Sequence, residues 1–232
     1  MESARRVEPE WLDQLPAADP RAVRSRRDLA RINVLMANAR IVARELRTRF
    51  PNGVTALLEL GAGDGTFALA VVAALPRPTA PATVTLLDRA PCVREGLEAR
   101  FASHGWGMQV LEADVFDGLD RFSAPVPAVV ANLFLHHFDD ARLAALLAHV
   151  ARRSEVFVAC EPRRSHTALL ASHLLGLIGC NDVTRHDAVV SVRAGFRGGE
   201  IGALWPRGGG PVEERGRGLF SHSFVASSGA IA

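Results

Sequence analysis

The chain has 232 residues, of which 48% are hydrophobic and 22% are charged, and its formal net charge is +2 at pH 7. This composition predicts one folded domain and excludes a largely disordered chain. All 27 basic residues are arginines, and acids are interspersed with them along most of the sequence, so a nucleic-acid partner is not expected.

The N-terminal part predicts a helical region followed by a buried strand. Between residues 20 and 50, apolar residues recur at helical spacing and arginines lie on the opposite face, as in one long amphipathic helix or two short ones. The arginines at positions 21 to 31 are interpreted as the solvated face of this region. Pro51, Asn52 and Gly53 end the helical pattern, and the apolar run 54–60 is typical of a buried strand.

Strands and helices then alternate. Helices are expected over residues 66–75, 91–103 and 141–151, the last capped by Asp139 or Asp140. Further strands are expected over residues 83–87, 108–111, 126–131 and 155–160. Five strands in this alternation predict an α/β fold with a parallel sheet and helices on both faces.

The pattern changes after Pro162. A helix is expected over residues 169–177, and a second one follows the polar segment 181–187 and ends near Phe196. The glycines at 208–210 are interpreted as a loop. Two final strands are expected, over residues 200–204 and 219–226.

The cysteines and the N-terminal residues indicate the cellular compartment in which the protein is expected. Cys92, Cys160 and Cys180 are odd in number and lack C-x-x-C spacing, so neither a disulfide framework nor a zinc site built on cysteines is expected. Residues 1–10 carry charges where an export signal has an apolar stretch, and the apolar run 168–178 is too short to span a bilayer. These features predict a cytoplasmic protein with no membrane anchor.

The most informative motif is a run of alternate glycines directly after the first predicted strand. Gly61, Gly63 and Gly65 allow a tight turn and let a ligand approach the backbone closely. The helix expected from Thr66 points its free N–H groups at the same place. A dinucleotide loop would have glycine or alanine at position 66, so Thr66 disfavours a pyrophosphate ligand.

Acidic residues end the next two predicted strands. Asp88 lies where a carboxylate can accept hydrogen bonds from both hydroxyl groups of a ribose. Asp114 follows the third strand and could accept a hydrogen bond from an adenine amino group. Because ligands bind outside the carboxyl ends of parallel strands, the loop and the two acids together predict an adenosine site.

These residues resemble a known family. The segment 58–66 is similar to the first motif of class I S-adenosylmethionine-dependent methyltransferases, and Asp88 and Asp114 match the second and third motifs. The segment 131–138 looks like the fourth-strand segment of small-molecule methyltransferases, including enzymes of quinone pathways. The resemblance covers residues 54–161.

The resemblance implies a Rossmann-like, doubly wound sheet of seven strands, mostly parallel with an antiparallel C-terminal strand, in a single domain spanning residues 1–232. It implies an N-terminal helical cap (1–50), a donor-binding core (54–161), an acceptor-pocket insertion (162–200) and C-terminal strands (200–227). S-adenosyl-L-methionine is the implied cofactor. The residues implied to bind it are Glu59, Gly61, Ala62, Gly63, Gly65, Asp88, Arg89, Asp114, Val115, Asn132 and Leu133.

His136 and His137 are the candidate catalytic residues. They follow the fourth strand, beside the expected position of the transferable methyl group, and histidine titrates near neutral pH, as a general base acting on a phenol or enol must. The alternative is structural, with one ring packed under the next helix and the other bonded to backbone. A metal site is not expected, because the side chains of successive residues diverge and no second ligand cluster is evident.

The acceptor pocket is expected between the fifth strand and the C-terminal strands, where polar residues lie among apolar ones. The candidate substrate-binding residues are His166, Thr184, Arg185, His186 and Arg193. Each of them could instead cap a helix or be solvated.

The expected activity is methyl transfer to oxygen or carbon of a small phenolic, polyketide-like or quinone-like molecule. The alternative is a non-catalytic module that binds S-adenosylmethionine within a biosynthetic complex. A third reading, an NAD-dependent oxidoreductase, rests on shared sheet architecture alone.

Overall fold

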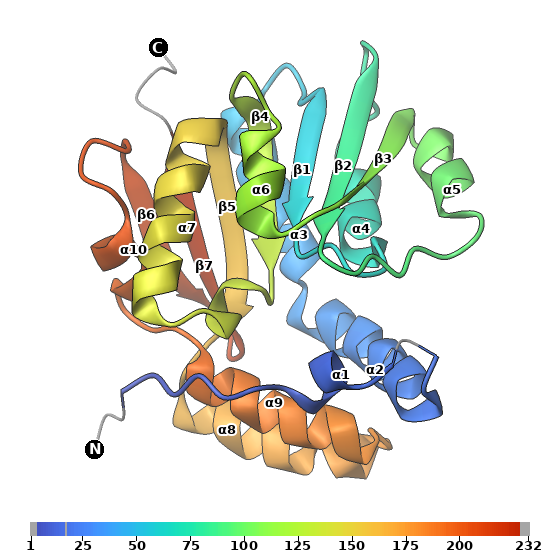
Figure 1. Ribbon diagram of the computed structural model, residues 1–232, viewed down its shortest axis with the longest axis vertical. Helices are drawn as coiled ribbons and strands as arrows, with labels where there is room; N and C mark the ends of the chain where they lie inside the picture. Colours follow the sequence, from blue (N-terminus) through green and yellow to red (C-terminus); the bar gives the residue numbers. More distant parts are fainter. Residues whose placement is uncertain (1–3, 17, 228–232) are drawn as a thin grey trace.

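A computed structural model describes residues 4–16 and 18–227, which form a seven-stranded sheet with helices on both faces (Figure 1). The strand order is β3-β2-β1-β4-β5-β7-β6, and β7 alone runs antiparallel to its two neighbours. The predicted fold class is thereby confirmed. The strands are β1 (Ala56–Leu60), β2 (Ala82–Asp88), β3 (Trp106–Glu112), β4 (Val126–Asn132), β5 (Ser154–Pro162), β6 (Val212–Arg217) and β7 (Ser221–Ser227).

Alternate residues of the central strands face two separate cores. In β4, Ala128 and Val130 belong to one apolar cluster, whereas Val129 and Ala131 belong to the other. This is the period-two alternation of a strand that is buried on both faces. The first core is covered by α3 (Asn38–Arg49), α4 (Thr66–Ala74) and α5 (Leu97–Ser103), and the second by α6 (Val115–Asp120), α7 (Asp140–Arg153) and α10 (Glu200–Leu204).

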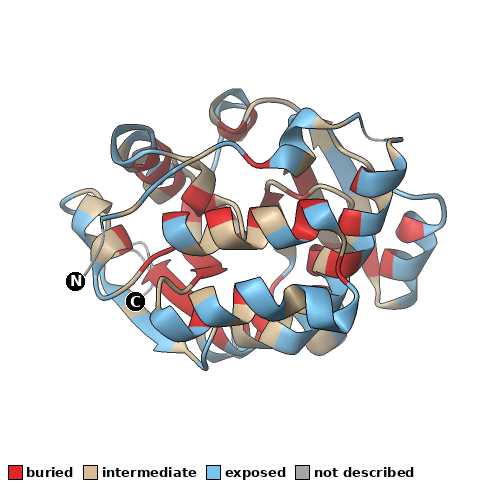
Figure 2. Ribbon diagram, turned by 90° about the horizontal axis from the view of Figure 1, so that it is seen from below, coloured by how far each residue is buried: buried red, intermediate tan, exposed pale blue. Residues whose placement is uncertain are grey.

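A further layer of helices lies beyond the carboxyl ends of the parallel strands (Figure 1). Its elements are α1 (Trp11–Gln14), α2 (Pro20–Met36), α8 (His166–His173), the 3-10 helix η2 (Leu174–Ile178) and α9 (Asp182–Ala194). The N-terminal segment runs along α9, and seen from below these helices extend across that end of the sheet (Figure 2). The sheet edge that carries the candidate residues is therefore covered by segments from both ends of the sequence.

At the C-terminal side one predicted strand was wrong and one strand was not predicted. Residues 200–204 form the helix α10, not a strand, because a five-residue apolar run has no length from which its period can be read. The sixth strand is β6, Val212–Arg217, whose charged residues Glu213, Glu214 and Arg215 conceal it from a hydrophobicity pattern. Such charges are typical of an edge strand.

The region 20–50 forms two helices, one of the two predicted alternatives, and they meet at Ala37, whose φ of 56° is left-handed. Two other helices differ from the prediction. The helix expected from residue 91 begins only at Leu97, and α6 was not predicted. Asp139 caps α7 as expected, by accepting a hydrogen bond from the Arg142 N–H.

No helix within residues 4–16 and 18–227 is long and apolar enough to cross a membrane. The ends of the predicted single domain, residues 1–3 and 228–232, and residue 17 of the predicted cap lie outside the described residues.

Candidate functional site

The glycine loop leaves β1 and packs against the segment that follows β4. Gly61, Gly63 and Gly65 all have positive φ, at 67°, 53° and 70°. A Cβ atom on Gly61 would stand 2.2 Å from Cδ2 of Phe134, whereas one on Gly63 would meet no described atom within 4 Å. The loop therefore packs against Phe134 at Gly61 and leaves open space at Gly63. A ligand can approach the backbone closely at Gly63 because glycine has no Cβ atom.

Glu59 is the buried carboxyl group that lies in β1 just before the glycine loop. Its side chain is 2% exposed, and its carboxylate accepts a hydrogen bond of 3.2 Å from the Ala68 N–H of α4. Burial raises the pKa of Glu59 well above its usual range, and the nearby charges of Asp64 and Asp88 act in the same direction. Glu59 thus ties the end of β1 to the first turn of the following helix.

Asp88 joins the loop to the end of β2. One carboxylate oxygen accepts a hydrogen bond of 2.8 Å from the Gly63 N–H, and the other accepts one of 2.8 Å from the Ala90 N–H. Each oxygen keeps a further lone pair with which it can accept a hydroxyl group. Asp88 caps no helix, because α5 begins only at Leu97. Arg89 beside it is exposed.

Asp114 has a structural role of its own. Its side chain accepts a hydrogen bond of 3.0 Å from the Phe116 N–H and so caps α6. Val115, the first residue of α6, is buried, and Ala62 in the glycine loop is buried as well. The cap leaves the second carboxylate oxygen of Asp114 available for a ligand.

The end of β4 meets the junction of α2 and α3. The Asn132 Oδ1 atom accepts a hydrogen bond of 2.7 Å from Nδ2 of Asn38, and its Nδ2 lies 3.4 Å from Oδ1 of Asn33. Leu133 has a φ of 51°, a left-handed conformation that costs a residue with a side chain on the order of 1 kcal/mol. Strain of this kind clusters at functional sites.

His136 lies between two carboxylates. Its Nδ1 is 2.7 Å from Oε2 of Glu161, and its Nε2 is 3.3 Å from Oε1 of Glu10. Burial lowers the pKa of His136, but the hydrogen bonds and charges of the two glutamates outweigh burial and raise it to about 9. In the same way burial raises the pKa of Glu10, and His136 outweighs burial and brings it to about 2. His136 is therefore a cation at neutral pH.

His137 lies beside it in a different environment. The two ring centroids are 4.3 Å apart with the planes tilted by 31°, and the His137 side chain is 28% exposed. Burial and the charge of His136 lower the pKa of His137. Its Nδ1 lies 3.7 Å from Oδ2 of Asp13, whose own pKa is raised by burial. The expectation that the two adjacent side chains diverge was wrong, because they lie on the 3-10 helix η1 (Leu135–His137) and not on a strand.

Glu10 and Asp13 reach the histidines because α9 holds the N-terminal segment. Asp187 accepts hydrogen bonds of 2.8 and 2.9 Å from the N–H groups of Trp11 and Leu12. The Ser191 hydroxyl donates to Glu10. No local motif marks Glu10 or Asp13, so sequence reasoning missed both, whereas Glu161 is marked by its place directly after the fifth predicted strand.

Comparison with known proteins identifies the core. Residues 57–155 match the sequence family described as a methyltransferase domain. Over these residues the chain is similar to methyltransferase domains. No curated protein matches the chain.

Solved structures share the fold of the methyltransferase domain. An O-methyltransferase family protein from Burkholderia thailandensis is 19% identical, with a TM-score of 0.62, over 92% of this chain and 62% of that one. Mitomycin 7-O-methyltransferase is 21% identical, with a TM-score of 0.58, over 93% of this chain and 60% of that one. A plantazolicin methyltransferase solved with S-adenosylhomocysteine is 11% identical, with a TM-score of 0.61, over 94% of each chain. The chain thus spans about three fifths of the length of the first two.

The candidate substrate-binding residues are not all gathered at the histidines. Thr184 is fully buried and hydrogen-bonded to Ser25 and Asn181, so it holds α9 to α2. His166, Arg185 and Arg193 are exposed on α8 and α9. His186 lies next to the N-terminal segment, where its ring stacks on Trp11 with centroids 3.8 Å apart.

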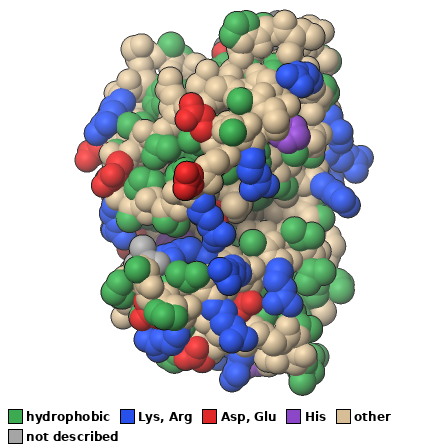
Figure 3. All heavy atoms as spheres, turned by 90° about the vertical axis from the view of Figure 1, so that its right-hand side faces the viewer, with side chains coloured by type: hydrophobic (Ala, Val, Ile, Leu, Met, Phe, Trp, Pro, Cys, Tyr) green, Lys and Arg blue, Asp and Glu red, His purple; other side chains and the backbone are tan. Residues whose placement is uncertain are grey.

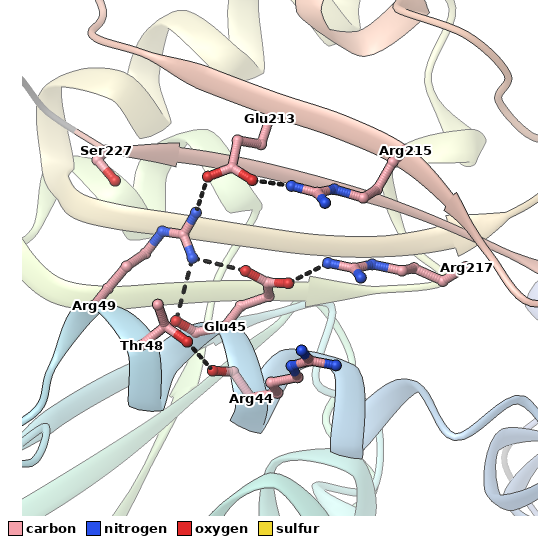
Figure 4. A pocket seen from close by; sticks show the side chains of 8 residues that line it. All are labelled: Arg44, Glu45, Thr48, Arg49, Glu213, Arg215, Arg217 and Ser227. Atoms are coloured by element: carbon pink, nitrogen blue, oxygen red, sulfur yellow. Dashed lines mark hydrogen bonds and ion pairs between the residues drawn. The ribbon is translucent and has the colours of Figure 1, made fainter.

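Several basic residues elsewhere in the chain are held by other contacts. The exposed arginines of α2 gather on the lower part of the face in Figure 3, and Arg24 and Arg31 donate to backbone carbonyl oxygens of Gly179 and Ile178. A hollow of about 440 Å³ lies between α3 and β6 (Figure 4). Its Arg49 and Arg217 are paired with Glu45. We assign this hollow no part in the candidate site.

Proposed function

We propose that the chain transfers the methyl group of S-adenosylmethionine to oxygen or carbon of a small phenolic, polyketide-like or quinone-like molecule. The observation that carries the proposal is the contact between the glycine loop and the histidine segment. Gly61 packs on Phe134, three residues before His137, so a donor on the loop and a base on the segment would face the same space.

The donor residues are proposed from the open side of the loop. Gly63 leaves room for the methionine part, Asp88 has lone pairs free for the ribose hydroxyls, and Asp114 with Val115 lies at the next strand end for the adenine. Glu59 orders the loop, and Asn132 and Leu133 lie near the reacting end. Bound there, the sulfonium supplies an electrophilic methyl group, and the protein has to align the acceptor and exclude water.

Of the two histidines, we propose His137 as the base and His136 as its positioning neighbour. Both ring nitrogens of His136 already face carboxylates, at 2.7 and 3.3 Å, so that ring has no free site for a substrate proton. His137 is partly exposed, and its Nδ1 lies 3.7 Å from Oδ2 of Asp13. His137 can therefore take the proton of a phenol or enol as the methyl group is transferred.

Methyl transfer can be tested with purified protein, S-adenosylmethionine labelled in the methyl group, and a panel of phenols, quinols and extracts from the source organism. We expect label in a small organic product and, in a separate calorimetric titration, binding of S-adenosylhomocysteine. Donor binding with no transfer to any acceptor would instead identify a non-catalytic module. Binding of NAD without S-adenosylhomocysteine would overturn the donor assignment.

A further inference from the structure

We propose that Glu10, His136 and His137 bind a divalent transition-metal ion such as Zn²⁺. Each residue offers one ligand atom, and these three atoms all lie within 4.8 Å of one another. The residues come from two parts of the chain, the N-terminal segment and η1, and the fold brings them together.

The ligand set favours this kind of ion. Two imidazoles and one carboxylate are a common protein ligand set for zinc, and they leave a coordination position open for water or substrate. Magnesium and calcium prefer sites made of oxygen atoms alone. The chemistry of the three side chains therefore selects a transition metal.

The surrounding residues orient the three ligands. Glu161 is fully buried and accepts hydrogen bonds from the Phe134 and Leu135 N–H groups, so its carboxylate is held rigidly. It lies 2.7 Å from Nδ1 of His136, which turns Nε2 towards Glu10. Metal-binding histidines characteristically donate their second N–H to such a carboxylate. The Ser191 hydroxyl orients Glu10, and Asp13 lies 3.7 Å from Nδ1 of His137.

The charge balance of the cluster points the same way. Glu10 and Glu161 are both buried and face the single ring of His136, and Asp13 and Asp187 lie close by. Buried carboxylates require a compensating positive charge. A divalent ion at the three ligand atoms would bring positive charge into this group of carboxylates.

Binding would also have a structural consequence. Glu10 belongs to the segment that is held on α9, whereas the histidines belong to the methyltransferase domain, so one ion would join the two. An ion that binds only the folded chain raises its stability. With the ion bound, His137 serves as a ligand. Its ring can therefore take a proton from the acceptor molecule only in the metal-free chain.

The test is a calorimetric titration of the full chain with Zn²⁺ after chelator treatment, and a second titration with Co²⁺ followed by its visible absorption. We expect one ion per chain, a higher Tm with Zn²⁺, and Co²⁺ bands typical of mixed nitrogen and oxygen ligands. His137→Ala and Glu10→Gln should each weaken binding by about tenfold or more. His149→Ala is the matched control and should bind the ion as the wild type does. His149 is a partly exposed histidine on α7 that lies next to Asp120.

Two outcomes would overturn the inference. One is the absence of saturable binding in the wild-type chain, and the other is equal affinity in His137→Ala and the wild type, which would indicate adventitious binding. Because His137 is partly exposed, its variant is expected to fold even if Glu10→Gln does not. Titration of the same samples with S-adenosylhomocysteine keeps the proposals separate, since the metal inference can fail while donor binding persists.

Discussion

Gly61 and Phe134 are in direct contact, and this contact joins the loop after β1 to the segment after β4. The Cα of Gly61 faces the aromatic ring so closely that a Cβ atom would lie 2.2 Å from Cδ2, and the φ of Gly61 is 67°. Both the space and the backbone conformation at this position require glycine.

We therefore expect Gly61→Ala to lower the free energy of unfolding by about 2 to 4 kcal/mol, through overpacking and backbone strain together. Gly63→Ala, at a φ of 53° with open space, should cost only the strain, about 1 to 2 kcal/mol. Urea denaturation measures both variants. Combining Gly61→Ala with Phe134→Ala should recover part of the loss, and equal costs at the two glycines would contradict the role of Phe134.

Asp88→Ala should weaken binding of S-adenosylhomocysteine by about 1 to 3 kcal/mol, because charge-assisted hydrogen bonds to the ribose would be lost. Isothermal titration calorimetry measures the change. Circular dichroism must show a folded variant, since Asp88 also accepts from the N–H groups of Gly63 and Ala90. Asp120→Ala, at an exposed position at the end of α6, serves as the control. Unchanged affinity in folded Asp88→Ala would refute the ribose assignment.

The two histidines should respond differently to substitution. His136→Ala would leave Glu10 and Glu161 buried without their partner, so we expect a loss of about 3 to 5 kcal/mol in stability. His137→Ala should keep its stability but reduce kcat by about 10² to 10⁴, as removal of a general base does. Thermal unfolding and single-turnover methyl transfer measure the two effects. Full activity in His137→Ala would exclude it as the base.

Asp187→Ala should release the N-terminal segment, because the N–H groups of Trp11 and Leu12 would lose their shared acceptor. Hydrogen exchange followed by mass spectrometry should show faster exchange at residues 10–14, with little change in β4 and β5. Asp182→Ala is a suitable control, since Asp182 lies exposed at the start of the same helix. Unaltered exchange at residues 10–14 would show that the segment is held by other contacts.

Glu59→Gln tests the buried carboxyl group. Because burial raises its folded-state pKa, the folded chain binds a proton that the unfolded chain releases, so this group makes stability fall as pH rises above about 4.5. The variant lacks this titration. We expect the unfolding free energy of Glu59→Gln, relative to wild type, to increase between pH 5 and pH 7 in paired urea denaturations. A difference that is constant with pH would contradict the raised pKa.

The order of the strands and helices in the core could be read from local patterns. Apolar runs such as 54–60 and 155–160 are strands because their residues must be buried on both faces of a parallel sheet, and the glycines after the first run mark its turn. The same reasoning failed where burial is weak. The charges of Glu213 and Arg215 gave β6 no apolar signature, and the five residues of α10 were too few to reveal a helical period.

The sequence by itself determined the sheet, the glycine loop and the carboxylates that follow the strands, because each of these depends on residues close together in the chain. Only the tertiary structure decided what surrounds His136 and His137. Glu10 is 126 positions from His136 in the sequence, and it reaches that ring because α9 binds the backbone of the N-terminal segment. Contacts between such distant residues leave no spacing to read, yet they determine the charge of His136 and create the cluster of possible metal ligands.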